Sequence, residues 1–271
     1  MVPEKKPNIV FFISCDIKNA TAYKRAKEKT WMFRILHYLQ EVERIILNEF
    51  RGKVSAEQWK RLGDETILAI FPRNDKGIQD IYNCVITINE KIIELSEKEK
   101  LHGKLKLFVA GYTFYDKPIA YGDDERSDDK FNTELTNKGF INVMFDTTVP
   151  SDNNEIVNQT VSVDFLGEDI DIGFRLSNFT EEGKILLSAK AAFLFAHFCQ
   201  NSFRISKVKK VKRLKGVWNG KKYPIIFLEK NITEPTKHFS KVDKSYKKAN
   251  PDKPIGCFLS LVEKILSNKV T

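Results

Sequence analysis

The chain has 271 residues, of which 42% are hydrophobic and 30% charged, and its formal net charge is +9 at pH 7. This length and composition fit a globular protein with one large domain, or one domain with an appendage, and exclude a disordered or fibrous chain. No apolar stretch reaches the length of a membrane helix, no secretory leader is recognisable, and the four cysteines lack metal-type spacing. We therefore expect a cytoplasmic protein without a membrane partner, and the positive charge favours an anionic partner.

The first part of the chain predicts alternating strands and helices. Hydrophobic periodicity, together with glycine and charged residues at the breaks, sets the boundaries of these elements. In order, they are a buried strand (8–15), one or two helices (21–50), a hairpin around Gly63 (54–62 and 66–72), an amphipathic helix (78–95) and a strand (104–114).

The second part opens with a polar segment, residues 116–160, which we interpret as an insertion with long loops and a strand near 140–145. Regular elements then resume, and the chain ends in a lysine-rich extension. They are a strand (161–165), a helix (167–178), a strand (184–187), a helix capped by Ser188 and ending near 199, a strand pair (203–215 and 223–228) and a short helix (254–266).

The order β-α-ββ-α-β is typical of a ferredoxin-like, palm-type α+β fold with a mainly antiparallel central sheet flanked by helices. We expect one domain over residues 1–229, containing the insertion, and an extension over 230–271.

Two aspartates stand where such a fold brings strand ends together. Asp16 ends the first apolar run, and Asp64 lies in the hairpin turn after Gly63. Converging carboxylates suit a pair of hard divalent cations in phosphoryl or nucleotidyl transfer. Taken singly, each aspartate also fits an ordinary turn position, so the rest of the chain has to decide between these readings.

Five segments in order resemble the catalytic domain of class III nucleotidyl cyclases, over roughly residues 8–229. Each segment alone is weakly specific, but their order and their placement on strands and helices make the resemblance strong. The segments are FISCDIKNAT (12–21), KRLGDETILAIF (60–71), DFLGEDIDIGFRL (164–176), EGKILLS (182–188) and LKGV (214–217).

The resemblance implies an enzyme with two Mg²⁺ or Mn²⁺ ions in each active site, held by Asp16, Asp64 and the backbone carbonyl of Ile17. One ion is implied to activate the ribose 3′-hydroxyl and the other to neutralise the triphosphate. Arg175 is implied to stabilise charge in the transition state, although it is also spaced to pair with Asp171 one helical turn earlier. In this family each site combines residues of two subunits, so the resemblance predicts an active homodimer.

The base-binding and sugar-binding positions depart from the family pattern. We place the adenine-reading lysine of the family five residues before the hairpin glycine, where this chain has Gln58, and its partner aspartate at Asp164. An amide and a carboxylate match the edge of uracil, and the amide can also turn to match other bases. Asp171 replaces the ribose-orienting asparagine. Lys60 and Lys215 are further candidates for substrate binding.

With these departures, the chain resembles the pyrimidine cyclases of bacterial Pycsar antiphage defence. That resemblance implies conversion of UTP, or next CTP, to a cyclic monophosphate that activates a separate effector protein. One alternative is an adenylate or guanylate cyclase with an altered base pocket. The other is a degenerate cyclase domain that binds nucleic acid through the basic segment 207–213, which the retained carboxylates and Arg175 disfavour.

Overall fold

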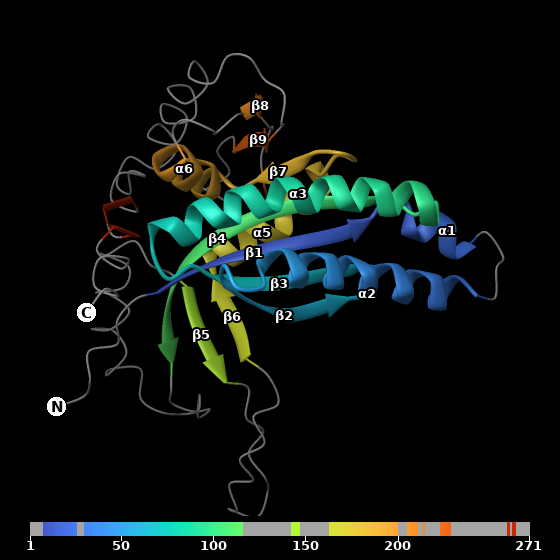
Figure 1. Cartoon of the computed structure of the whole chain (residues 1–271), viewed down its shortest axis with the longest axis horizontal. Coiled ribbons are helices and arrows are strands. Elements are labelled where there is room, and N and C mark those ends of the chain that lie inside the picture. The colour runs from blue at the N-terminus through green and yellow to red at the C-terminus, as the bar shows by residue number, and fades with distance from the viewer. Residues whose placement is uncertain are drawn as a thin grey trace, which may run out of the picture.

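The computed structural model describes residues 8–25, 30–115, 142–146, 163–199, 205–210 and 223–228, together with 214, 259, 260, 262 and 263. Figure 1 shows the whole chain. In order, the elements are β1 (Asn8–Ile17), α1 (Ala20–Arg25), α2 (Trp31–Phe50), β2 (Ser55–Leu62), β3 (Glu65–Phe71), α3 (Asp75–Glu99), β4 (Gly103–Tyr115), β5 (Asn142–Asp146), β6 (Val163–Gly167), α5 (Glu168–Leu176), the 3₁₀ turn η1 (Ser177–Phe179), β7 (Ile185–Leu187), α6 (Ala189–Phe198), β8 (Ile205–Lys210) and β9 (Pro224–Leu228).

The strands form one mixed sheet in the order β2-β3-β1-β4-β7-β9-β8, with β5 and β6 joined through β4. Among the described strands, β4 pairs in parallel with β5 and β7, and every other pairing is antiparallel. The central strand β1 lies between β3 and β4, and its register sets Asp16 opposite Glu65 on one side and Lys104 on the other. This register determines the charges around Asp16.

Alternate side chains of β1 enter two separate cores, as the two-residue period of a strand requires. Phe11 and Ile13 join the larger core, to which α2, α3 and α6 contribute their apolar faces. Figure 1 shows α2 and α3 side by side across the sheet, and α1 at the end towards which β1 runs. Phe12 points the other way, into a smaller cluster that includes Phe108 and Phe165.

The smaller cluster is aromatic and lies beneath α5. Five rings in and against it, which we call the aromatic cluster, have centroids 4.7 to 6.5 Å apart in the contacting pairs; they belong to Phe12, Trp59, Phe108, Phe165 and Phe174. Gly173 lets α5 approach closely, because a Cβ atom there would come within 2.4 Å of the Phe108 ring. The cluster therefore fixes the height of α5 above the sheet.

The fold prediction is confirmed, including the β-α-ββ-α-β order and the mainly antiparallel sheet. The helical segment 21–50 is two helices, the strand expected near 140–145 is β5, and Ser188 caps α6 by accepting from the Ala191 amide. The rest of the insertion and most of the extension lie outside the described residues. Within the extension, Val262 is fully buried in the larger core.

Candidate active site

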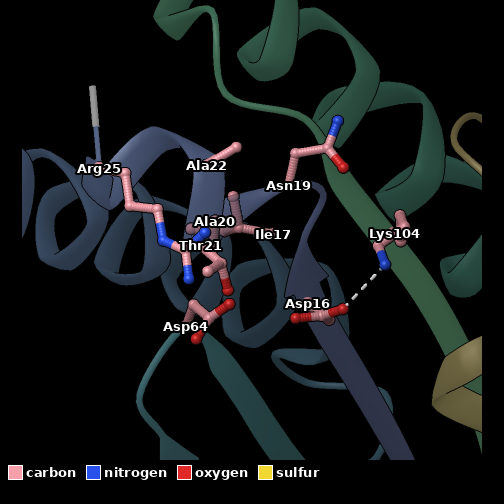
Figure 2. Close-up of a pocket in the computed structure, with 9 residues that line it drawn as sticks. All are labelled: Asp16, Ile17, Asn19, Ala20, Thr21, Ala22, Arg25, Asp64 and Lys104. Carbon is pink, nitrogen blue, oxygen red and sulfur yellow. Dashed lines mark ion pairs between the residues drawn. The ribbon is translucent and has the colours of Figure 1, made fainter.

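Asp16 and Asp64 line one surface pocket with a volume of about 700 Å³. Figure 2 shows their carboxylates in that pocket, Asp16 from the end of β1 and Asp64 from the β2–β3 turn. The remaining walls come from the β1–α1 turn, from α1 and from the start of β4. The lining residues are Asp16, Ile17, Asn19, Ala20, Thr21, Ala22, Arg25, Asp64 and Lys104.

The backbone of the turn that carries Asp64 is fixed by a glycine and by a hydrogen bond to β1. In the turn, Gly63 has a φ of 67°, a left-handed conformation that glycine adopts without a Cβ penalty. The Ile17 amide donates to the Asp64 carbonyl at 3.2 Å, which joins the turn to the end of β1. The two carboxylates are thus brought together by main-chain geometry.

Glu43 of α2 anchors the strands that flank the turn. Its side chain accepts from Arg61 through both Nε and Nη2, at 3.1 and 2.5 Å, and from Thr66 at 2.6 Å. Gln58 donates to the same carboxylate at 3.2 Å. Because Glu43 is nearly buried, these hydrogen bonds form where water competes little, and they tie both strands of the hairpin to α2.

Each pocket carboxylate pairs with an ammonium group. Lys104 Nζ lies 2.9 Å from Asp16 Oδ2, and Lys24 Nζ lies 3.0 Å from Asp64 Oδ1. Burial raises the pKa of Asp16, the hydrogen bond and charge of Lys104 lower it, and repulsion from Glu65 and Asp64 raises it again. The pocket therefore concentrates negative charge at one point and compensates it with flexible lysines.

A second, deeper ion pair lies beneath the pocket. Lys106 is 1% exposed, and its Nζ is 2.7 Å from Glu65 Oε1. Ser14 donates a hydrogen bond to Glu65, and Lys106 donates one to Ser177, which follows the end of α5. Burial lowers the pKa of Lys106, while Glu65 opposes that shift. This buried network links β1, β3 and β4 to the helix that carries Arg175.

The donor chemistry of the pocket fits Mg²⁺ or Mn²⁺. Asp16 and Asp64 offer hard carboxylate oxygens, and both already attract a cationic side chain. No group of three or more His, Cys, Asp or Glu side chains with metal-binding geometry occurs within the part of the chain that the structure describes. Two carboxylates suffice for Mg²⁺ where substrate phosphates and water complete its coordination.

A second group of polar side chains gathers around Asp164, at the start of β6. Lys60 Nζ lies 2.7 Å from Asp164 Oδ1, and it also sits 4.8 Å from the centre of the Trp59 ring. The partner of Asp164 in the structure is therefore Lys60, whereas Gln58, which the sequence placed beside Asp164 at the base, contacts Glu43. A bulge in β2 shifts the register between Gln58 and Lys60, so Gln58 turns to Glu43 and Lys60 faces the aspartate.

Arg175 and Asp171 are not among the residues that line the pocket of Asp16. Arg175 is half-buried on α5, and Asp171, one turn earlier, is exposed. Among the described residues these two side chains form no ion pair with each other, although the spacing allows one. Lys215 lies outside the described residues, as does the part of the basic segment after Lys210.

Sequence reasoning missed the basic half of the site. Lys104 and Lys106 occur two residues apart in a strand that is otherwise strongly apolar, and that pattern was the available signal. A lysine pair on one face of a buried strand needs acidic partners. The partners could not be assigned without the register, which sets Lys104 opposite Asp16 and brings Glu65 to Lys106. Lys24 carries no comparable signal.

Comparison with known proteins gives matches at the level of structure only. No protein-family model matches the sequence, and no curated protein matches it. The guanylyl cyclase Cya2 is similar with a TM-score of 0.54 and 10% identity, covering 86% of this chain and 97% of that one. The adenylyl cyclase CyaB from P. aeruginosa is similar with a TM-score of 0.50 and 13% identity, covering 85% and 98%.

A third similar structure is the catalytic core of a rhodopsin-guanylyl cyclase with converted specificity in complex with ATPαS. Its TM-score is 0.51 with 14% identity, covering 85% of this chain and 100% of that one. The chain therefore has the class III nucleotidyl cyclase fold, and the likeness extends over nearly the whole of each compared domain. None of the described helices combines the length and the apolar character needed to cross a membrane.

Proposed function

We propose that the chain is a class III nucleotidyl cyclase that converts a nucleoside triphosphate to its 3′,5′-cyclic monophosphate and pyrophosphate. The observation that carries this proposal is the convergence of Asp16 and Asp64 on one pocket, from a strand end and a hairpin turn joined by the Ile17–Asp64 hydrogen bond. The fold of known adenylyl and guanylyl cyclases surrounds that pocket. The structural match and the carboxylate geometry both support this proposal.

In this reaction the ribose 3′-oxygen forms a bond to the α-phosphorus, and the bond from that phosphorus to the bridging oxygen breaks. Pyrophosphate leaves with the electron pair, and the 3′-hydroxyl proton passes to water. Two divalent cations on Asp16, Asp64 and the Ile17 carbonyl would supply charge neutralisation and a more acidic 3′-hydroxyl. The protein holds those oxygens in place through the β1–β3 pairing and the hairpin anchor on Glu43.

The active sites are proposed to be composite and to lie between two copies of the chain. Asp164, Lys60 and Arg175 lie outside the lining of the Asp16 pocket of the same protomer. A head-to-tail homodimer would bring the carboxylates of one subunit to the base-reading pair and the arginine of the other. Arg175 would then meet the triphosphate, where a planar guanidinium binds phosphate oxygens in a bidentate manner. Asp171 would face the sugar.

The base is proposed to be read by Lys60 and Asp164 acting together, a donor beside an acceptor. Uracil presents a carbonyl oxygen beside an N–H group, and cytosine and adenine each present a ring nitrogen beside an amine. The pair complements all three edges. The proposal of a pyrimidine, UTP before CTP, therefore rests on the resemblance to Pycsar cyclases. Because the lysine–aspartate pair also complements adenine, ATP is the alternative to the two pyrimidine triphosphates.

A product assay with each of the four nucleoside triphosphates and Mn²⁺ tests both levels of the proposal. Cyclic UMP or cyclic CMP as the dominant product would support the pyrimidine substrate and a role as second-messenger synthase for a separate effector in antiviral defence. Dominant cyclic AMP or cyclic GMP would refute the pyrimidine substrate and leave the cyclase intact. If no triphosphate is turned over and salt-dependent DNA or RNA binding is found instead, the degenerate module would replace the proposal.

The composite sites have a direct test in mixed variants. Asp64→Ala and Arg175→Ala homodimers should each be inactive, because both of their sites lack one essential group. Mixing the two variants should restore partial activity, since each heterodimer would contain one complete site. The matched control mixes Asp16→Ala with Asp64→Ala, which damage the same half-site and should give no recovery. Equal results from the two mixtures would contradict shared sites.

A further inference from the structure

Lys104 differs from the other charged groups of the pocket in its position. It is the second residue of β4, it stands opposite Asp16 in the strand register, and it lines the pocket beside both aspartates. Figure 2 shows its ammonium group reaching Asp16 across the β1–β4 pairing. Its side chain keeps 19% of its surface exposed. A lysine in this setting remains in contact with solvent and is free to change partners.

Lys106 lies on the same face of β4 as Lys104 and provides a comparison, because its contacts are structural. It is 1% exposed, pairs with Glu65 and donates to Ser177, so its hydrogen bonds are fully committed to the protein interior. Lys104, by contrast, forms its ion pair with Asp16 at the pocket wall. Within the described part of the chain, Asp16 is the one acidic side chain within ion-pair distance of Lys104. The two lysines therefore have different roles.

A divalent cation on Asp16 competes with the Lys104 ammonium, which lies 2.9 Å from Oδ2 of that carboxylate. The released ammonium stays tethered at the pocket wall and needs a new anionic partner. The nearby carboxylate, Asp64, already pairs with Lys24 at 3.0 Å. The anion that would enter this pocket under the proposed function is the triphosphate of the substrate.

We propose that Lys104 is a triphosphate-binding residue that also competes with the divalent cation for Asp16. The inference rests on the proposed function and assigns to β4 a phosphate contact. Before substrate binds, Lys104 compensates the charge of a half-buried carboxylate. Once the cation and the nucleotide are bound, its ammonium donates to phosphate oxygens. Lys24 of α1 pairs in a similar way with the other carboxylate, Asp64.

The test uses Lys104→Met and two binding measurements that need no turnover. Mn²⁺ binding to the nucleotide-free protein is followed by the electron paramagnetic resonance of free Mn²⁺. Binding of inorganic tripolyphosphate in the presence of Mn²⁺ is followed by calorimetry. We expect Mn²⁺ to bind about threefold more tightly, because the competing ammonium is gone, and tripolyphosphate to bind about tenfold more weakly. A misfolded variant would weaken both, so opposite signs identify the role.

Two further variants sharpen the result. Lys104→Arg keeps the charge and should retain tripolyphosphate binding to within about twofold. Lys76→Met removes an exposed lysine that pairs with Asp80 on α3. This pair lies at the end of α3 away from α1 (Figure 1), so the variant should change neither the Mn²⁺ affinity nor the tripolyphosphate affinity. Unchanged tripolyphosphate binding by Lys104→Met, or Mn²⁺ binding that is not tightened, overturns the inference. A wild-type protein that binds neither probe would instead refute the proposed function itself.

Discussion

Replacing Lys106 by methionine tests the buried network beneath the candidate site. The lysine side chain is 1% exposed and that of Glu65 is 14% exposed, so the pair is shielded from water. Methionine fills a similar volume but leaves the Glu65 carboxylate unpaired beside Asp16 and Asp64. Removing one partner of a buried pair costs about 3–5 kcal/mol, because an uncompensated charge stays in the interior. We expect Lys106→Met to lower the free energy of unfolding by that amount.

The double variant separates the loss of the charge pair from the loss of packing. Adding Glu65→Gln to Lys106→Met removes the unpaired charge and retains a group that accepts from Ser14. The total cost should then fall to about 1–2 kcal/mol, which is about 2–3 kcal/mol less than the cost of Lys106→Met alone. Urea unfolding monitored by circular dichroism measures Lys106→Met, Glu65→Gln and the double variant, with unchanged m-values as the condition for comparison. A Lys106→Met cost below about 1 kcal/mol, or strictly additive effects, would refute the reasoning.

Two further predictions concern packing and pH. Gly173→Ala should destabilise the protein by about 1–3 kcal/mol in urea unfolding despite the helix propensity of alanine, because its Cβ would lie 2.4–2.6 Å from the Phe108 ring. Adding Phe108→Leu should relieve part of that cost. An unchanged unfolding midpoint for Gly173→Ala would contradict the close packing. Burial raises the pKa of Cys199 to about 12 from a reference of 9.0, so its thiol favours the folded state below pH 9. The stability advantage of the wild type over Cys199→Ala should therefore decline as the pH rises above 9, measured by urea unfolding at each pH, and a pH-independent difference would contradict the shift.

The placement of the carboxylates was predictable from the sequence, because local patterns determine it. Asp16 ends a continuous apolar strand, and Asp64 follows a glycine whose φ of 67° suits a tight hairpin turn. Strand order in a palm-type fold then brings a strand end and a neighbouring turn together. These are short-range or topological signals that a single sequence carries in full.

The side chain that pairs with Asp164 could not be predicted, because it depends on an irregularity of the backbone. Counting residues back from Gly63 selected Gln58, but a bulge between Gln58 and Lys60 changes which side chain faces Asp164. Sequence spacing assumes a regular alternation of faces, and one extra residue in a strand inverts that alternation. The competing acceptor Glu43, from a different element, then fixes Gln58 elsewhere.

The sequence by itself determined the fold class, the order of the elements and the two acidic positions, since hydrophobic periodicity and turn chemistry act over short stretches of chain. Only the tertiary structure decided the partners of the charged groups. Lys104 meets Asp16, and Lys106 meets Glu65, because β1 pairs with β3 on one side and β4 on the other. Ion pairs between distant segments depend on strand register, which arises from the packing of the whole sheet rather than from any one segment.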